Sequence, residues 1–240
     1  MTSLRIGTSG WHYAHWKGSF YPAELPSEEW LGFYCQHFDT VEINNTFYQL
    51  PDDLTFQQWH DTVPPAFEFA VKASRFITHM KKLKDPQAPV NQFLGSVQVL
   101  SDRLGPVLFQ LPPNWNLNLA RLRSFLEILP PAASYAFEFR NPSWFDSRVY
   151  GLLGEFDVAF CIHDMANQPS PKVVTADTVY VRFHGPEGKY QGFYDNQTLA
   201  GWAGAFSTWL RQGKQIYAYF NNDQQGFAPR NARSLLDMLT

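Results

Sequence analysis

Charged side chains recur at alternate positions near the ends of several strand-like segments of this 240-residue chain. They are two carboxylates, one lysine, two arginines and one histidine: Glu42, Lys72, Glu138, Arg140, Arg182 and His184. Paired carboxylates can act as general acid and base, and arginine forks suit phosphate or carboxylate groups. The sequence therefore predicts acid–base chemistry on an anionic substrate, with Glu42, Glu138 and His184 as the catalytic candidates.

Further polar and aromatic residues share these segment ends or the loops that follow them. We predict that the following residues bind the substrate: Ser9, Trp11, Asn44, Tyr48, Lys72, Gln110, Arg140, Trp144, Asp164, Arg182, Asn221 and Asn222. Flat aromatic rings beside polar groups suit stacking on a sugar or a nucleobase. Packing of long loops onto the rest of the protein explains the same rings nearly as well.

Lys72 could serve either as a reactive amine or as an anion-binding cation. Desolvation could depress its pKa and make it a proton-transfer or Schiff-base lysine. Close to two carboxylates, however, we expect it to stay protonated and to bind anions.

A divalent metal ion is the minority alternative for this site. Its possible ligands are Glu42, Glu138, His163, Asp164 and His184. No His-x-His or His-Glu-x-x-His spacing marks a metal site among them. Asp164 also has the opposite strand parity to His163, so both can face one site only where the strand has ended. We therefore predict no metal and no other cofactor.

Eight short segments rich in β-branched and aromatic residues can position these side chains. They begin near Leu4, Asp39, Phe67, Gly105, Ser134, Asp157, Thr178 and Gln215. Their spacing of 21 to 38 residues fits a repeated strand, loop and crossover helix. Eight such units predict a closed TIM-type (β/α)₈ barrel with a parallel sheet. A doubly wound open sheet is the alternative, disfavoured because no Gly-x-Gly-x-x-Gly follows the first segment.

The segments between the strands mostly show helical periodicity. Helices are predicted within 89–104, 118–129, 198–212 and 229–239. The exception is 165–177, where one Asn and two Pro residues interrupt any helix, so the sixth helix should be short or missing. No linker separates the units, and we predict a single TIM-barrel domain over 1–240.

Alternation along the strands predicts which side chains enter the barrel. In the fifth strand, Glu138 and Arg140 lie on the face opposite Phe137. The polar face should point inward, and its residues gather at the C-terminal mouth, where such barrels build their sites. Arg5 and Glu68 fall at the other end and should form a structural ion pair. A self-neutralising plug of charges is the alternative to a site at the mouth.

The net charge, the lengths of apolar stretches and the cysteine content argue against several classes of function. The net charge is −3, so duplex nucleic acid and anionic membranes have no general electrostatic attraction for the chain. No apolar stretch reaches signal-peptide or membrane-span length. Cys35 and Cys161 have no partner spacing and should be buried, reduced thiols. We expect a cytoplasmic protein, and its oligomeric state stays open.

Seven ordered blocks of sequence resemble a known family. They are GTSGW at 7–11, VEIN at 41–44 with TFY at 46–48, FAVK at 69–72 with ITH at 77–79, LFQLPP at 108–113, FEFR at 137–140 with SW at 143–144, YVRFHG at 180–185, and YAYFNN at 217–222 with APRNA at 228–232. Together they look like domain of unknown function family 72, the YecE-like family, over nearly the whole chain. The resemblance implies a TIM-type barrel and no established reaction. This chain has Phe227 where the family often has histidine.

Two function classes remain open. The first is an acid–base, hydrolase-like enzyme for an anionic polar small molecule such as a sugar phosphate or nucleotide. Glu42 and Glu138, from the second and fifth strands, should then act from well-separated sides of the mouth. The second is a non-catalytic module that binds a phosphorylated ligand or a nucleic-acid end. In both, the partner is a small anionic or carbohydrate-like ligand.

Overall fold

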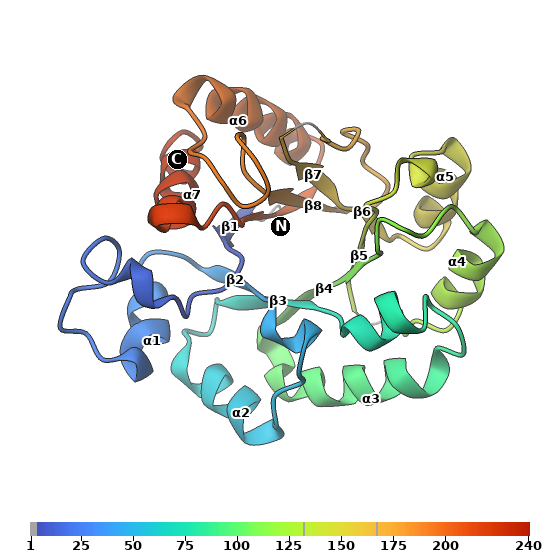
Figure 1. Ribbon diagram of the computed structural model, residues 1–240, viewed down its shortest axis with the longest axis horizontal. Coiled ribbons are helices and arrows are strands. Elements are labelled where there is room, and N and C mark those ends of the chain that lie inside the picture. The colour runs from blue at the N-terminus through green and yellow to red at the C-terminus, as the bar shows by residue number, and fades with distance from the viewer. Residues whose placement is uncertain (1–3, 132, 167) are drawn as a thin grey trace.

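Strands in the middle of the molecule are surrounded by helices (Figure 1). The computed structural model describes residues 4–131, 133–166 and 168–240. Its strands are β1 Leu4–Thr8, β2 Thr40–Ile43, β3 Glu68–Lys72, β4 Leu104–Gln110, β5 Tyr135–Glu138, β6 Ala159–Phe160, β7 Ile162–Asp164, β8 Thr178–Phe183 and β9 Gln215–Phe220.

All strand pairs are parallel, in the orders β2-β3-β4-β5-β6 and β1-β9-β8-β7. Cys161 alone separates β6 from β7, and its N–H donates to the Phe137 carbonyl at 2.8 Å. β6 and β7 are thus two halves of the sixth strand, one paired with β5 and the other with β8. A bridge between Ser9 and Glu42 joins the remaining seam. The sheet closes as the predicted TIM-type barrel.

The seam between β1 and β2 depends on one tyrosine and one glycine. The Tyr34 hydroxyl accepts the Thr8 N–H at 2.9 Å and donates to the Thr40 carbonyl at 3.0 Å. At Gly7, a Cβ atom would lie 2.2 Å from the Thr40 oxygen. Only glycine therefore lets the two strands approach this closely.

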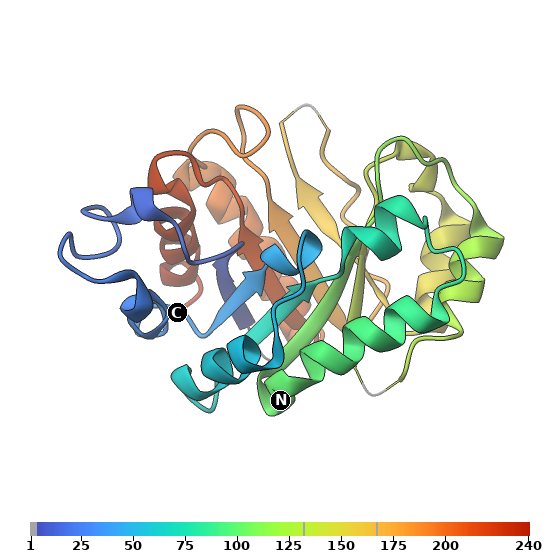
Figure 2. The same cartoon turned by 60° about the horizontal axis from the view of Figure 1, so that its bottom comes forward.

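The helices lie outside the strands: α1 Trp30–Tyr34, α2 Asp53–Thr62, α3 Gln87–Val97, α4 Leu119–Leu126, α5 Ser147–Glu155, α6 Asn196–Arg211 and α7 Phe227–Asp237 (Figure 2). Side chains of Asp52, Asn118, Asp146 and Asp195 cap the N-termini of α2, α4, α5 and α6. The described residues of 165–177 contain no helix, as predicted. Asn167 lies outside the described residues. The predicted helix 89–104 ends earlier, because α3 tightens into a 3₁₀ segment after Val97.

Two separate apolar clusters confirm the predicted strand parity. The larger one lies between strands and helices and contains Val41, Phe137 and Phe183. The smaller one fills the barrel with alanines and tyrosines: Ala70, Leu108, Ala136, Ala159, Cys161, Ala176, Tyr180, Tyr217 and Tyr219. Small residues at most inner positions leave room for long polar side chains toward the mouth. In the described part of the chain, no helix has the length and hydrophobicity that a membrane crossing requires.

Candidate functional site

The lower end of the barrel holds the ion pair that the sequence predicts. Arg5 Nη2 lies 2.9 Å from Glu68 Oε1, and Arg5 Nη1 lies 2.6 Å from Asp39 Oδ2. The Tyr217 hydroxyl donates to Glu68 Oε2 at 2.6 Å. Arg5 is thus bound by two carboxylates. The cluster is self-contained and fits a structural role.

Near the mouth, a buried inner cluster is organised around Arg182. Its Nη1 lies 2.6 Å from Glu138 Oε2, and its Nη2 lies 2.6 Å from Glu42 Oε1. Both carboxylates are fully buried. Glu42 and Glu138 stand on strands that β3 and β4 separate, as the sequence predicts, and Arg182 lies between them. The long arginine reaches across from β8 and brings both carboxylates to one guanidinium.

Arg140 bridges the other side of this cluster. Its Nη2 lies 2.5 Å from Glu138 Oε1 and 2.7 Å from His184 Nε2. Nε2 also lies 3.1 Å from Glu138 Oε1, so this ring nitrogen faces both a guanidinium donor and a carboxylate acceptor. Burial lowers the pKa of His184 well below its usual range, and the adjacent Arg140 lowers it further. His184 is therefore a neutral, fully buried ring inside the cluster.

The two carboxylates of the inner cluster are saturated. Burial raises the pKa of Glu138, but Arg140 and Arg182 outweigh this effect and hold it well below its usual range. Glu42 accepts further hydrogen bonds from Ser9 Oγ at 2.8 Å and from the Tyr180 hydroxyl at 2.7 Å. Two carboxylates and two guanidinium groups balance each other. The inner cluster thus behaves as the plug that was the alternative reading of these charges.

Above the inner cluster lies a hollow of about 630 Å³, the mouth pocket. Its lining comes from the C-terminal ends of five strands and from their loops: Tyr13, His15, Asn44, Tyr48, Lys72, Arg182, Lys189, Tyr190, Gln191, Asn221, Asp223, Gln224 and Gln225. Five predicted substrate-binding residues are among them. They are Asn44, Tyr48, Lys72, Arg182 and Asn221.

Lys72 is the buried charge without an acidic partner. It ends β3, its side chain is 8% exposed, and Nζ lies 4.1 Å from the centre of the Phe47 ring. Among the described residues, no carboxylate oxygen lies within 4.0 Å of Nζ. Burial lowers the pKa of Lys72 to about 7, and Arg182 adds to the effect, whereas Glu138 and Glu42 oppose it. That Lys72 stays protonated beside two carboxylates remains a prediction, and the pairing of both carboxylates with Arg182 weakens its basis.

Two charged residues lie at the rim of the mouth pocket. Lys189 forms no ion pair among the described residues, whereas both carboxylate oxygens of Asp223 are bound. Asp223 Oδ2 lies 3.0 Å from His15 Nε2, and its other oxygen accepts the Trp16 indole N–H at 2.6 Å. Lys189 is exposed and has no carboxylate within 4.0 Å in the described part of the chain. The mouth pocket is thus lined by an excess of positive charge.

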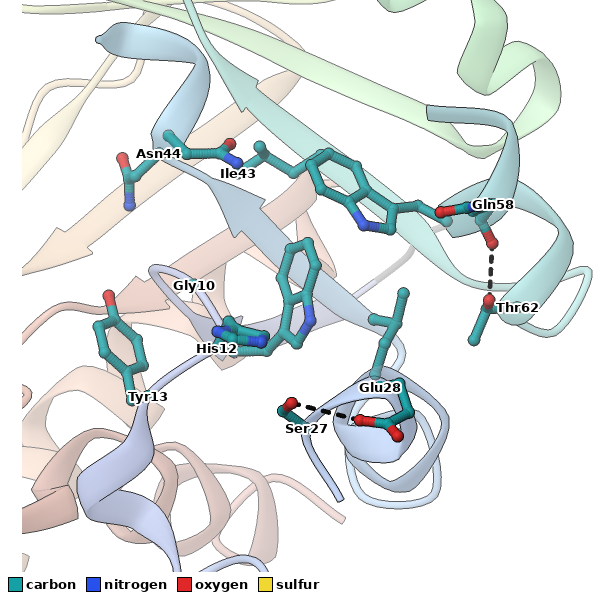
Figure 3. A pocket seen from close by; sticks show the side chains of 13 residues that line it. Gly10, His12, Tyr13, Ser27, Glu28, Ile43, Asn44, Gln58 and Thr62 are labelled. Carbon is teal, nitrogen blue, oxygen red and sulfur yellow. Dashed lines mark hydrogen bonds between the residues drawn. The ribbon is translucent and has the colours of Figure 1, made fainter. Parts of the chain in front are cut away.

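A second hollow of about 730 Å³ adjoins the mouth pocket and shares Tyr13 and Asn44 with it. Figure 3 shows these two residues on one side of it and Ser27 and Glu28 on another. The full lining of this aromatic hollow is Gly10, Trp11, His12, Tyr13, Ser27, Glu28, Leu31, Ile43, Asn44, Asn45, Gln58, Trp59 and Thr62. Trp11 meets Trp59 edge to face at 5.1 Å. The predicted ligand residue Trp11 therefore belongs to this hollow.

Two predicted binding residues point away from the mouth. Trp144 is fully buried, stacks on Phe139 at 4.9 Å and donates its indole N–H to the Trp115 carbonyl at 2.7 Å. Asp164 accepts the indole N–H of Trp202, on α6, at 3.2 Å. Asp164 follows the parity of the outer layer because β7 continues through it. Both residues stabilise the packing of helices and loops on the barrel.

Four further predicted residues lie outside the lining of both hollows. Asn222 is fully buried and donates to the Gly192 carbonyl and to Asn231 Oδ1, both at 2.9 Å. Gln110 is partly exposed at the end of β4. Ser9 and Arg140 are buried and bound within the inner cluster.

Sequence reasoning missed the residues that the last loops bring over the mouth. Lys189, Gln191 and Gln224 come from loops whose conformation strand parity does not describe. A signal was present at Gly185, which has φ +109° and where a Cβ atom would lie 2.1 Å from the Gln191 oxygen. This glycine lets the loop after β8 fold back over the pocket. Phe227, at the position of the family histidine, packs instead against Phe193.

Within the described ranges, no group of three His, Cys, Asp or Glu side chains could hold a metal ion. His184, Glu42 and Glu138 of the inner cluster are each bound to arginine or hydroxyl partners. The chemistry available at the mouth is therefore that of an amine, amides, hydroxyls and cations.

Relatives and solved structures share this architecture. YunF of Bacillus subtilis, a UPF0759 protein, is 29% identical over 270 residues that cover 98% of this chain and 94% of YunF. YecE of Escherichia coli K12 is 33% identical over 113 residues, which cover 47% of this chain and 42% of YecE. A DUF72 family protein of Thermotoga maritima superimposes with a TM-score of 0.90 at 29% identity, covering 99% of both chains.

A more distant structure shares the fold alone. D-psicose 3-epimerase of Clostridium cellulolyticum H10 superimposes with a TM-score of 0.59 at 9% identity, over 98% of each chain. The family model described as "Protein of unknown function DUF72" matches residues 5–240. This match, with the relatives above, agrees with the sequence blocks, and the chain belongs to the DUF72 family.

Proposed function

We propose that this chain is an enzyme that binds an anionic polar small molecule, such as a sugar phosphate or a nucleotide, and acts on it by acid–base chemistry. The site is the mouth pocket at the C-terminal end of the barrel. The aromatic hollow beside it would accept a sugar ring or a base, because tryptophan faces and amides suit both. No cofactor is part of the proposal.

The observation that carries the proposal is the unbalanced cation Lys72. The inner cluster neutralises its own charges, so it adds no net charge to the pocket above it. Lys72 and Lys189 remain without carboxylates, at the floor and the rim of one hollow. A buried, unpaired amine lowers the stability of a protein, and such groups persist mainly where they serve a function.

Lys72, rather than a carboxylate pair, is the group we assign to proton transfer. Glu42 and Glu138 are buried beneath the pocket and paired with Arg182, and Arg140 and Arg182 hold the pKa of Glu138 well below its usual range. Lys72 lines the pocket, and its pKa of about 7 lets it accept a proton near neutral pH. We therefore assign the role of general base, which the sequence suggests for a carboxylate, to the amine of Lys72.

A binding module without turnover is the second candidate. It is favoured by the same two lysines, because an anion held between them needs no reacting group. The two candidates share the anion site. They differ only in whether Lys72 changes its protonation state while the ligand is bound.

Anion binding can be measured by thermal unfolding in millimolar phosphate against chloride at equal ionic strength. We expect phosphate to raise Tm by roughly 2–4 °C, about 1 kcal/mol for a chain of this size. Lys72→Met and Lys189→Met should each reduce the shift. Lys214→Met is the matched control, because Lys214 lies at the opposite end of the barrel beside Asp177. Equal shifts in parent and Lys72→Met would remove the anion site.

Turnover separates the two candidates. The probe is 4-nitrophenyl phosphate, followed by release of nitrophenolate between pH 6 and 9. An enzyme that uses Lys72 as a base should gain activity as the pH rises through about 7. Release equal to that of Lys72→Met would leave the binding module as the function.

A further inference from the structure

We propose that Lys72 forms an imine with a carbonyl carbon of the anionic molecule that occupies the mouth pocket. This inference rests on the proposed anion site and adds the class of its ligand: a small aldehyde or ketone that carries a phosphate or carboxylate group. It makes Lys72 a nucleophile as well as a base.

The position of Lys72 suits covalent chemistry. The residue ends a central strand, and its carbonyl accepts the Thr46 hydroxyl at 2.7 Å, which fixes the backbone from which the side chain extends. The butyl stem is buried, the amine faces Phe47 at 4.1 Å, and the residue lines the mouth pocket. A ligand in the hollow therefore meets this amine at the pocket floor, as the reactive group of a rigid element.

The surroundings keep the amine nucleophilic. Within the described residues, no carboxylate is close enough to pair with it, and the buried Arg182 opposes a second positive charge beside it. At pH 7.5 more than half of such an amine is unprotonated, whereas a lysine with a pKa near 10.4 is ~0.1% unprotonated. Only the unprotonated amine has the electron pair that the reaction needs.

The step balances without any further reagent. The Nζ electron pair adds to the carbonyl carbon, the carbonyl oxygen takes up a proton, and Nζ loses one. The carbinolamine hydroxyl then takes up a proton and leaves as water while the nitrogen electron pair forms the C=N bond. Loss of the remaining N–H proton returns that proton and gives the neutral imine, so a C=N double bond replaces the C=O double bond. No electron is gained or lost overall, so neither an oxidant nor a reductant is required.

The rest of the pocket fits the remainder of such a ligand. Lys189 at the rim provides a cation for a phosphate or carboxylate group. Asn44 and Asn221 line the same hollow and can hydrogen-bond hydroxyl or carbonyl oxygens. The imine nitrogen would take the position of Nζ, so the ion pairs of the inner cluster beneath it are preserved.

Reductive trapping tests the proposal. Parent protein is incubated at pH 7.5 with dihydroxyacetone phosphate and sodium cyanoborohydride, and the labelled lysine is located by peptide mass spectrometry. We expect the label on Lys72 at a rate roughly 500-fold above that of exposed lysines such as Lys84, given their difference in free amine. Dihydroxyacetone, which lacks the phosphate, should label Lys72 more slowly, and inorganic phosphate should protect it.

The labelling of two variants and the distribution of label over the lysines of the parent decide whether Lys72 forms the imine. Lys72→Arg keeps a positive charge and should lose the fast label, whereas Lys214→Met should keep it. Label spread evenly over surface lysines in the parent would overturn the imine, even where Lys72→Arg fails to fold. If phosphate still raises Tm in that case, the proposed anion site survives and only the imine fails. If neither effect is seen, both proposals fail.

Discussion

At the N-terminal end of the barrel, Arg5 meets Asp39 and Glu68, and each charge of this cluster has a partner of opposite sign among the described residues. At the C-terminal end, Arg182 likewise joins two carboxylates, yet Lys72 stands beside this cluster without a carboxylate partner in the described residues. Both ends contain ion pairs, so ion pairing by itself does not distinguish structure from site. What marks the C-terminal end as a site is Lys72, which lines the mouth pocket and has no carboxylate partner among the described residues.

The two clusters also differ in burial, and this difference sets their energetic weight. Glu138 and Arg182 are 0% and 1% exposed, whereas the Glu68 side chain is 26% exposed. A buried charge that loses its partner cannot be solvated, so its loss is costly. A half-exposed charge can turn to water.

The largest expected effect is at the inner cluster. Glu138→Gln keeps the shape of the side chain but removes the charge that pairs with Arg182 and Arg140. We expect a loss of roughly 3 to 5 kcal/mol in the free energy of unfolding, measured from urea transitions. If Glu138 instead lined an open, hydrated site, its replacement would cost little stability. A loss below about 1 kcal/mol would return Glu138 to the candidate catalytic groups.

The next effect is a pH dependence that belongs to Lys72. Its pKa is lowered from 10.5 to about 7, so between these values the unfolded chain binds a proton that the folded chain does not. The free energy of unfolding should therefore rise with pH across this window, by at most about 1.4 kcal/mol per pH unit. Lys72→Met should remove this slope.

Urea unfolding of parent and Lys72→Met at pH 7.5, 8.5 and 9.5 isolates the contribution. Below pH 7 both forms of the parent bind the proton, and the difference between the proteins should become constant. Tyrosines with raised pKa values, such as Tyr13, act only at higher pH and cancel in the comparison. Parallel curves over the whole range would show that Lys72 is an ordinary lysine.

The smallest effect is expected at the lower cluster. Glu68→Gln removes one of two partners of Arg5, which keeps Asp39 at 2.6 Å. The new amide can still accept the Tyr217 hydroxyl through its oxygen. We expect a loss of about 1 kcal/mol or less, measured by the same urea transitions. A loss as large as that of Glu138→Gln would mean that the two ends do not differ in kind.

Much of the barrel could be predicted from the sequence because alternation within strands is a local property. The polar parity of β5 and β8 placed Glu138 and Arg182 inside correctly, and the breakers in 165–177 correctly excluded a sixth helix from its described residues. Asp164 has the parity opposite to His163, as the sequence indicates, and its inclusion among the binding residues was wrong because β7 continues through it.

The site could be predicted only in part, because pairing depends on side-chain length and loop course. Alternation shows that Glu42 and Glu138 point inward, but not that one arginine spans the barrel to hold both. Lys189 reaches the pocket through a loop that folds back at Gly185, which no periodicity encodes. The depressed pKa of Lys72 follows mainly from burial, which the sequence suggests as one alternative but does not decide.

The measurement that tests the central claim most directly is the pKa of the Lys72 amine itself. The parent protein, labelled with ¹³C at lysine Cε, is titrated by NMR between pH 5.5 and 11, and Lys72→Arg assigns the resonance. We expect one lysine to titrate near 7 and the exposed lysines near 10.4, with the Lys72 value rising when phosphate occupies the mouth pocket. A Lys72 resonance that titrates above 9.5 would contradict an unpaired amine at the floor of the site.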